Sequence, residues 1–350
     1  MERRIDLRSD TVTLPTEAMR RAMYQAEVGD DVWGEDPTVK RLQEMAAERM
    51  GKEAALFVAS GTMGNLVSLL AHCRRGDEVI LGDECHIVHY EVGAAAVFGG
   101  LIYRTVSTTR FGELPLGEIE GAIRGPNVHF PPTGLICLEN THNRCGGTVL
   151  SVDYMRQVYE LAGRHNLPVH LDGARIFNAA IALGVEAREI ARYADSVMFC
   201  LSKGLSAPVG SLVCGTAEFI ERAHRMRKMV GGGMRQVGVI AAAGIVALEE
   251  MVERLAEDHE NARRLAEGLA NIPGLAVDLE TVQTNMVMFY PTDPRWTTES
   301  LTQALWEEGV LLSYLGRTKI RAVTHYGIDR NDIEEALRRI RNVIQRGGKQ

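Results

Sequence analysis

The sequence contains no long apolar run, since its hydrophobic stretches fall well short of the roughly 18 residues that a membrane-spanning helix needs. Its first six residues are mostly charged, and no apolar signal segment follows them. We therefore expect no membrane partner and predict a cytoplasmic protein. Clustered positive charge is also missing, because the formal net charge is -7. Nucleic-acid binding depends on concentrated Lys and Arg, so a small-molecule substrate is favoured over a nucleic acid.

Cysteine is scarce, and the six cysteines are scattered singly instead of in the two-residue spacing of zinc and redox sites. They are Cys73, Cys85, Cys137, Cys145, Cys200 and Cys214. We expect reduced thiols and no metal site. The Gly-x-Gly-x-x-Gly turn of nicotinamide-binding folds is also missing after the first strand of the expected sheet, so that class ranks lowest.

The hydrophobic pattern predicts a large α/β domain, followed by a smaller one that the length of 350 residues also allows. A helix is expected from Pro37 to Met50, because Asp36 can cap its start and Gly51 can end it. Apolar strands then alternate with helical patterns, which predicts a mostly parallel sheet covered by helices on both faces. The expected strands are 54–59, 78–81, 101–106, 135–138, 169–171, 196–201 and 211–214, and the helical spacers include 65–73, 152–165 and 217–226.

A long helical pattern from about Val237 to Leu269 is expected to bridge the two domains. The remainder predicts a small α+β domain. Its expected strands are 285–289, 310–312 and 320–323, and its expected helices are 298–308 and 330–344. We therefore place the large domain, with the N-terminal segment, at residues 1–248 and the small C-terminal domain at 249–350.

Lysine is rare, since only six of the 39 basic residues are lysines, so each lysine position is informative. Lys203 follows the apolar run 196–201, at the end of an expected buried strand. An amine that loses hydration there can attack an aldehyde carbon, and an arginine could not. Taken alone, a lysine at a strand end is more often a structural or solvated charge.

Two other strand ends carry polar groups. Asp172 ends the strand 169–171, at the edge where α/β sheets bind ligands, and could keep a pyridine nitrogen protonated. The alternative is that Asp172 caps the helix starting near Arg175. Residues 60–62 (Ser-Gly-Thr) precede a helix and could bind a phosphate, although many helix caps share these residues. Three such groups at successive strand ends indicate one cofactor site.

Several longer motifs narrow the family. They are DLRSDTVT at 6–13, GDDVWGEDP at 29–37, ENTHN at 139–143, HLDGAR at 170–175 and GGGMRQ at 231–236. With the three strand-end groups, they resemble the low-specificity L-threonine aldolases, which are fold-type I pyridoxal-phosphate enzymes of the aspartate aminotransferase superfamily. The resemblance covers nearly the whole chain. It implies an α/β, transferase-like large domain with a small C-terminal α+β domain.

The resemblance also assigns catalytic roles. It makes Lys203 the Schiff-base lysine of pyridoxal phosphate and Asp172 the partner of the ring nitrogen. His86 would stack on the ring, and His142 would be a second active-site histidine. His89 lies three residues after His86, which leaves the identity of the stacking imidazole open. A metal cluster of these three histidines has no carboxylate or cysteine spacing to support it.

Binding roles follow from the same resemblance. Arg321 and Ser9 would bind the substrate carboxylate, and Arg175 would lie near that carboxylate or the cofactor oxygen. The expected phosphate ligands are Ser60, Gly61 and Thr62, joined across a subunit interface by Lys228 and Arg235. The implied assembly is a homotetramer, a dimer of dimers.

The implied reaction is the retro-aldol cleavage of L-threonine or L-allo-threonine to glycine and acetaldehyde, with other β-hydroxy-α-amino acids also accepted. His86 or His142, directly or through a water, would remove the proton of the β-hydroxyl. One alternative is another fold-type I reaction, a β-eliminating lyase or an aminotransferase. Another is a non-catalytic scaffold that keeps the fold.

Overall fold

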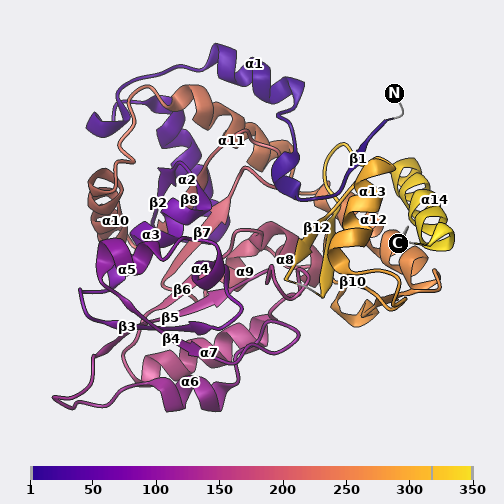
Figure 1. Cartoon of the computed structure of the whole chain (residues 1–350). Coiled ribbons are helices and arrows are strands. Elements are labelled where there is room, and N and C mark those ends of the chain that lie inside the picture. Colours follow the sequence, from indigo (N-terminus) through magenta and orange to yellow (C-terminus); the bar gives the residue numbers. More distant parts are fainter. Residues whose placement is uncertain (1–2, 317, 348–350) are drawn as a thin grey trace.

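The computed structural model describes residues 3–316 and 318–347, which form a large α/β body and a smaller α+β body (Figure 1). A seven-stranded sheet in the order β2-β8-β7-β6-β5-β3-β4 runs through the large body. Strand β8 is antiparallel to both of its neighbours, β2 and β7, and the other neighbouring pairs are parallel, which confirms the mostly parallel sheet. The strands are β2 (Ala54–Val58), β3 (Glu78–Gly82), β4 (Ile102–Val106), β5 (Thr133–Glu139), β6 (Val169–Asp172), β7 (Ser196–Cys200) and β8 (Ser211–Gly215).

Helices cover both faces of this sheet, as expected. Side chains alternate along β7, so that Val197 and Phe199 enter one hydrophobic cluster while Met198 and Cys200 enter another. The first cluster includes α2, α6, α7, α8, α9 and α11, and the second includes α3 and α10. The helices are α1 (Glu17–Gln25), α2 (Pro37–Met50), α3 (Gly61–His72), α4 (His86–His89), α5 (Ala94–Gly99), α6 (Leu116–Ala122), α7 (Val152–Arg164), α8 (Ile176–Leu183), α9 (Ala187–Ala191), α10 (Ala217–Met229) and α11 (Gly238–Glu250).

The ends of α2 are those that the sequence predicts. The Asp36 carboxylate accepts hydrogen bonds from the backbone N–H groups of Thr38 and Val39, at 3.1 and 3.0 Å. Gly51 closes the helix with a φ of 62°, in the left-handed region that glycine adopts without strain. Local signals were sufficient here because both caps are made by neighbouring residues.

The long helix expected at 237–269 is wrong in one respect, because it is two helices. The first, α11, ends at Glu250, and four residues separate it from α12 (Leu255–Ala270). Neither glycine nor proline occurs between them. The break instead follows from packing, since Met251, Val252 and Leu255 all enter the core of the large body. Such a tertiary cause leaves no local signal in the sequence.

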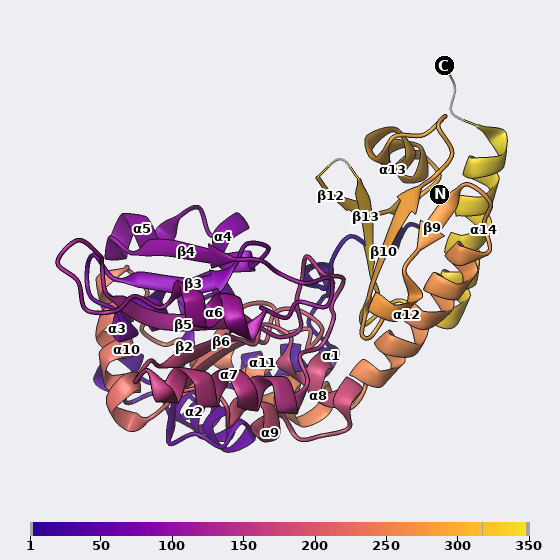
Figure 2. The ribbon, with the colours of Figure 1, turned by 90° about the horizontal axis from the view of Figure 1, so that it is seen from below.

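The small body has an antiparallel sheet in the order β12-β13-β10-β9, with helices packed on it (Figure 2). Its elements are α12, β9 (Leu275–Val277), β10 (Met286–Pro291), α13 (Thr298–Glu307), β11 (Val310–Leu311), β12 (Ser313–Leu315), β13 (Lys319–Val323) and α14 (Arg330–Arg346). The N-terminal strand β1 (Ile5–Asp6) pairs with β11, and Ile5 and Leu7 enter the small body's core. The division at residues 248 and 249 stays a prediction.

Short 3-10 helices complete the described elements: η1 (Asp10–Val12), η2 (Asp31–Trp33) and η3 (Leu279–Thr281). Within residues 3–316 and 318–347, no helix combines the length and the apolar character needed to cross a membrane. All six cysteines are free.

Candidate active site

A cavity of about 300 Å³ lies where the N-terminal segment, the large body and the small body meet. It brings together four residues that the sequence singled out and that are far apart in the chain: Ser9, His86, Arg175 and Lys203; a fifth, Arg321, comes from β13. The remaining lining residues are Thr11, Tyr90, Asn143, Ser313, Tyr314 and Leu315. The cavity is therefore the candidate active site.

Lys203 lies in the turn that follows β7 and is partly exposed at the cavity, so it is less desolvated than the sequence suggests. Its backbone carbonyl accepts hydrogen bonds from the Thr13 hydroxyl and the Ser206 N–H, both at 2.9 Å. The turn closes tightly, with Ser206 at a φ of 63°. These contacts hold the backbone of Lys203 while its amine faces the cavity.

Asp172 ends β6 and is only 2% exposed. One carboxylate oxygen accepts a hydrogen bond from the Ala174 N–H at 3.1 Å, so the local turn expected from the sequence is present. The other oxygen accepts from the side-chain amide of Asn65 at 2.8 Å. Because Asn65 lies on α3, the acid is held in place from the neighbouring helix as well.

His86 is the first residue of α4 and pairs with a buried acid. Its Nδ1 lies 3.0 Å from the carboxylate of Glu91, which is 3% exposed. Burial alone would lower the pKa of His86, but the hydrogen bond to Glu91 and the negative charge of Asp172 outweigh it and raise the pKa. Burial, together with the charge of Asp172, also raises the pKa of Glu91. His86 is thus a histidine with a bound carboxylate orienting its ring.

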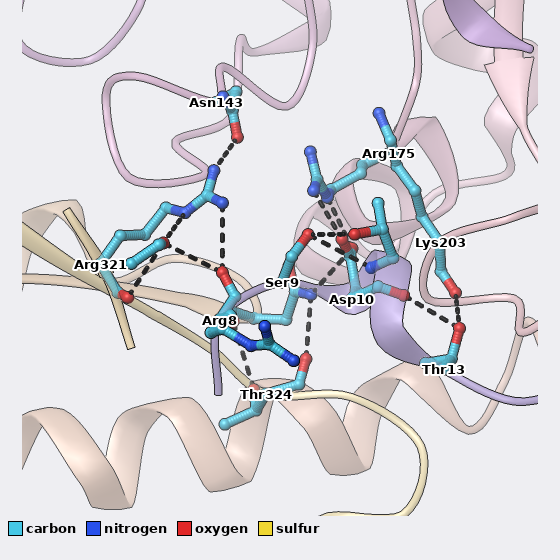
Figure 3. A network of polar contacts seen from close by, with 12 residues as sticks. Arg8, Ser9, Asp10, Thr13, Asn143, Arg175, Lys203, Arg321 and Thr324 are labelled. Carbon is cyan, nitrogen blue, oxygen red and sulfur yellow. Dashed lines mark hydrogen bonds and ion pairs between the residues drawn. The ribbon is translucent and has the colours of Figure 1, made fainter. Parts of the chain in front are cut away.

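Arg175 forms a buried ion pair with Asp10 (Figure 3). Its Nε and one terminal nitrogen each donate to a carboxylate oxygen of Asp10 at 2.6 Å. Burial would raise the pKa of Asp10, but the charge and hydrogen bonds of Arg175 hold it well below its ordinary value. The second terminal nitrogen of Arg175 is left for a ligand in the cavity.

Arg321 approaches the cavity from the other side of the Ser9–Asp10 segment (Figure 3). Its two terminal nitrogens donate to the Asn143 side chain at 2.8 Å and to the Arg8 carbonyl at 3.2 Å. Burial and the nearby charge of Arg175 lower the pKa of Arg321. The Ser9 hydroxyl accepts from the N–H and the hydroxyl of Thr11, so its own proton remains available for donation.

Ser60, Gly61 and Thr62 stand at the start of α3, one turn before Asn65, and they are not among the residues lining the cavity of 300 Å³. The Ser60 hydroxyl accepts from the Met63 N–H at 3.2 Å and caps the helix. A Cβ added to Gly61 would lie 2.8 Å from the sulfur of Cys200. Glycine therefore lets this helix N-terminus lie close against the end of β7.

Lys228 and Arg235 flank the glycine run 231–233. A Cβ on Gly232 would lie 2.6 Å from the sulfur of Met63, so this segment lies beside the first turn of α3. Arg235 donates to Asp30 at 2.9 Å and is half exposed. The role of Lys228 and Arg235 across an interface stays a prediction.

His142 is not among the lining residues of the cavity, although its neighbour Asn143 is. It is 1% exposed, and neither ring nitrogen has a hydrogen-bond partner among the described residues. Its ring forms a cluster of possible metal ligands with Cys85 and Glu139. A second cluster of this kind contains His86, Glu91 and Asp172. His89 is the third histidine of the metal cluster that the sequence left without support. Its Nε2 lies 2.8 Å from the Asp83 carbonyl. The structure therefore does not bring these three histidines together as ligands.

Four polar residues of the site escaped sequence reasoning: Asp10, Asn65, Glu91 and Asn143. Asp10 lies in the quoted DLRSDTVT motif, but nothing in the sequence joins it to Arg175, 165 positions away. For Asn65, a signal was present, since it follows the proposed phosphate segment by one helical turn. Glu91 stands five residues after His86, a spacing that carries no regular meaning outside a helix.

These residues fit pyridoxal phosphate. The cofactor needs an amine, which Lys203 presents, and an acid for its ring nitrogen, which Asp172 presents at 2% exposure. It also needs a phosphate cradle, and Gly61 provides a helix N-terminus at which a side chain would collide with Cys200. The electrostatics place these groups together, because the charge of Asp172 acts on His86 and that of Lys203 acts on both His86 and Asp10.

The fold and this site define a fold-type I pyridoxal-phosphate enzyme. The sequence profile of the family described as Beta-eliminating lyase matches residues 6–292. The chain is 52% identical over 339 residues to Low-specificity L-threonine aldolase 1 of Arabidopsis thaliana, covering 96% of this chain and 95% of that protein. It is 45% identical over 342 residues to the low specificity L-threonine aldolase of Escherichia coli strain K12, covering 98% and 100%.

Among solved structures, the Leishmania major threonine aldolase superposes with a TM-score of 0.83 at 18% identity, covering 96% of this chain and 98% of that one. At that identity the likeness concerns the fold, and it confirms the expected α/β architecture. The sequence identities carry the family. The chain belongs to the low-specificity L-threonine aldolase family, within the pyridoxal-phosphate-dependent lyases.

Proposed function

We propose that this protein cleaves L-threonine and L-allo-threonine to glycine and acetaldehyde, and that it also accepts other β-hydroxy-α-amino acids. The observation that carries the proposal is the convergence of Lys203, His86 and Arg321 on one cavity from three separate parts of the chain. Family membership supports the same reaction over β-elimination and transamination. A non-catalytic scaffold would need neither an amine nor a paired histidine in such a cavity.

The rim of the cavity binds and orients the substrate. Arg321 offers a planar guanidinium to the substrate carboxylate, and the free proton of the Ser9 hydroxyl can add a further hydrogen bond. Arg175 lies on the same cavity, with one terminal nitrogen not used by Asp10. Two fixed contacts to the carboxylate restrict rotation about the substrate's Cα, which decides the bond that can break.

Behind His86 lie the buried side chains of Asp172, Glu91 and Asn65, which we call the inner wall. Together with His86 they control the charge and the proton transfers of the reaction. Pyridoxal phosphate, when bound, supplies the electron sink for the pair released as the Cα–Cβ bond breaks. Asp172 offers a buried carboxylate to keep a proton on the ring nitrogen. His86, oriented by Glu91, accepts the β-hydroxyl proton directly or through one water as the aldehyde carbonyl forms. The same proton, passed on to Cα, completes glycine, and Lys203 would hold the cofactor through its amine.

The test is a product assay on the purified protein loaded with pyridoxal phosphate. Incubation with L-threonine and L-allo-threonine should release acetaldehyde and glycine in equal amounts, without ammonia or a keto acid. Ammonia with a keto acid would indicate β-elimination, and a keto acid without ammonia would indicate transamination. No product from any β-hydroxy-α-amino acid would leave the scaffold as the better account.

We further propose a cytoplasmic homotetramer built as a dimer of dimers. Large side chains in the first 33 residues support an interface, since Leu14, Tyr24 and Trp33 are 69%, 91% and 76% exposed. Lys228 and Arg235 would then reach the phosphate site of the neighbouring subunit. The six free cysteines suit a reducing compartment. Light scattering coupled to size exclusion should give four times the chain mass, and a monomer would contradict the assembly.

A further inference from the structure

A row of polar side chains leads away from the cavity behind Asp172, and the proposed reaction uses none of it. Asn65 contacts Asp172 at 2.8 Å, and His170 contacts Asn65 at 3.1 Å. Ser196 follows at 2.8 Å from His170, and His72 ends the row at 2.7 Å from Ser196. Asn65, His170 and Ser196 are at most 1% exposed. Buried polar groups this far from solvent need a reason to be there.

The secondary structure brings these side chains to one face. His170 and Asp172 are two residues apart on β6, and they therefore point to the same side of the sheet. Ser196 begins the neighbouring strand β7, opposite His170 in the register. Asn65 and His72 are seven residues apart on α3, so they lie two turns apart on one face of that helix. The row is thus a seam between α3 and the sheet.

The hydrogen bonds nearest the cavity can run in only one direction. The amide nitrogen of Asn65 donates to Asp172 and also to Glu91, the latter at 2.7 Å. Ionised carboxylates only accept, so both amide hydrogens are used and the amide oxygen faces His170. An amide oxygen also only accepts. The Nε2 of His170 must therefore carry a hydrogen.

The directions of the remaining hydrogen bonds in the row follow from the neutral state of both imidazoles. Burial lowers the pKa of His170 to about 4 and that of His72 to about 3, so both rings are neutral near pH 7. With its hydrogen on Nε2, His170 accepts at Nδ1 from the Ser196 hydroxyl. The oxygen of Ser196 then accepts from His72. Every member donates towards the carboxylates, which fixes the orientation of the Asn65 amide.

We propose that Asn65, with His170 and Ser196 behind it, is a positioning residue that holds the carboxylate of Asp172 directed at the ring nitrogen of pyridoxal phosphate. Asp172 and Glu91 have oxygens within 4.8 Å of each other and repel at that separation. The amide of Asn65 is the donor that they share. A reversed amide would turn its oxygen towards both carboxylates, and the hydrogen on His170 prevents that reversal. The proposal rests on the cofactor of the proposed function.

The test compares the affinity of the apoprotein for pyridoxal phosphate with its affinity for the 1-deaza analogue, which has carbon in place of the ring nitrogen. The unaltered protein should prefer pyridoxal phosphate. Asn65→Leu should weaken binding of pyridoxal phosphate by about 10- to 100-fold, the usual effect of losing a hydrogen bond to a charged group. Its affinity for the analogue should stay the same or increase, because that ring offers Asp172 no N–H.

Variants of His170 keep the test decisive if Asn65→Leu does not fold. His170→Phe removes the donor to Asn65 and should lower the preference for pyridoxal phosphate, whereas His170→Gln restores an N–H near the same place and should recover most of it. Ser196→Ala should have a smaller effect. Asn261→Leu is the matched control, since Asn261 is a buried asparagine that donates to the Ile328 carbonyl in the small body. It should leave the preference unchanged.

Two outcomes would overturn the proposal. Equal losses of affinity for both ligands in Asn65→Leu and His170→Phe would indicate a merely structural role. A protein that binds both ligands equally before any substitution would show that Asp172 does not act on the ring nitrogen at all. Neither outcome depends on turnover. A protein that shows the preference but releases no acetaldehyde would contradict the proposed function and support this inference.

Discussion

The buried inner wall behind His86 and the rim of the cavity are built in opposite ways. At the inner wall, Asp172 and Glu91 are at most 3% exposed and share the amide of Asn65, which itself belongs to a buried hydrogen-bonded row. The residues of the inner wall and of this row come from α3, β6, β7 and the segment after α4. In the large body, α3, β6 and β7 pack against one another. Sheet register places Asp172, His170 and Ser196, and α3 supplies Asn65 and His72.

The rim depends instead on contacts between distant segments. Arg321 comes from β13 of the small body, Ser9 from the N-terminal segment and Asn143 from the turn after β5. Arg321 spans all three segments with its hydrogen bonds to Asn143 and to the Arg8 carbonyl. Charge control therefore belongs to the large body alone, whereas carboxylate binding depends on how two bodies and a terminal segment are docked.

The largest loss of activity is expected from a substitution of Lys203, which lies between the inner wall and the rim. Lys203→Ala should lower acetaldehyde release by on the order of 10⁴-fold or more and remove the visible absorbance of the bound cofactor, because no other amine of the described residues lines the cavity. Lys52→Ala is a suitable control, since Lys52 is also partly buried but donates to the Ala194 carbonyl away from the cavity. Activity above a tenth of normal in Lys203→Ala would contradict the assignment.

Among changes at the rim, Asp10→Asn should weaken the docking of the two bodies most. Asp10 contacts both of them, because it pairs with Arg175 of the large body and accepts a hydrogen bond from Asn285 of the small body. Removing one partner of a buried ion pair costs about 3–5 kcal/mol of unfolding free energy. The midpoint of thermal unfolding should fall clearly. Asp153→Asn, which alters an exposed pair with Arg156, should change it little. Equal midpoints for the two variants would sink the idea.

The same ion pair predicts a pH dependence of stability. Arg175 holds the pKa of Asp10 below its unfolded value of about 3.9, so this contribution is fully present above that pH and is lost as pH falls through the lower folded pKa. Thermal unfolding measured from pH 7 down to pH 2 should show a smaller loss in Asp10→Asn than in the unaltered protein. Parallel curves would contradict the predicted linkage.

Substrate binding at the rim should be weakened by Arg321→Lys. A lysine keeps the charge but loses the planar fork, so kcat/KM for L-threonine should fall by about 10- to 100-fold, chiefly through a higher KM. The affinity for pyridoxal phosphate should be unchanged if rim and inner wall act separately. Arg341→Gln, an exposed position on α14, is the control. A loss that appears in kcat alone would place Arg321 in the chemistry instead of binding.

The smallest effect is expected from Glu91→Gln, which alters the inner wall without removing its shape. Because Glu91 and Asp172 raise the pKa of His86, the acidic limb of the kcat/KM profile should lie above the ordinary histidine pKa of about 6.5. Removing one negative charge should move that limb to lower pH. An unmoved limb would mean that His86 is not the proton acceptor, and His142→Asn would then be measured in the same way.

Most of the large body could be predicted from its sequence, because its strands are short, apolar and separated by helices with local caps. The helix at 37–50 begins after Asp36 and ends before Gly51, as these two capping residues predict. The break at 251–254 could not be predicted, since buried Met251 and Val252 cause it through packing. Nor could the path of β1, which leaves the large body to pair with β11 because Ile5 and Leu7 are apolar and find their core there.

Sequence alone determined which chemistry is available: one lysine, one acid and one capped helix start at the ends of strands, in motifs of the threonine aldolase family. Only the tertiary structure decided which groups meet. It joined Asp10 to Arg175 and Asn65 to Asp172, and it placed His86 in the lining of the cavity but not His142. The physical reason is that local propensities act over a few residues, whereas a buried charge can be stabilised only by partners that packing brings from elsewhere in the chain.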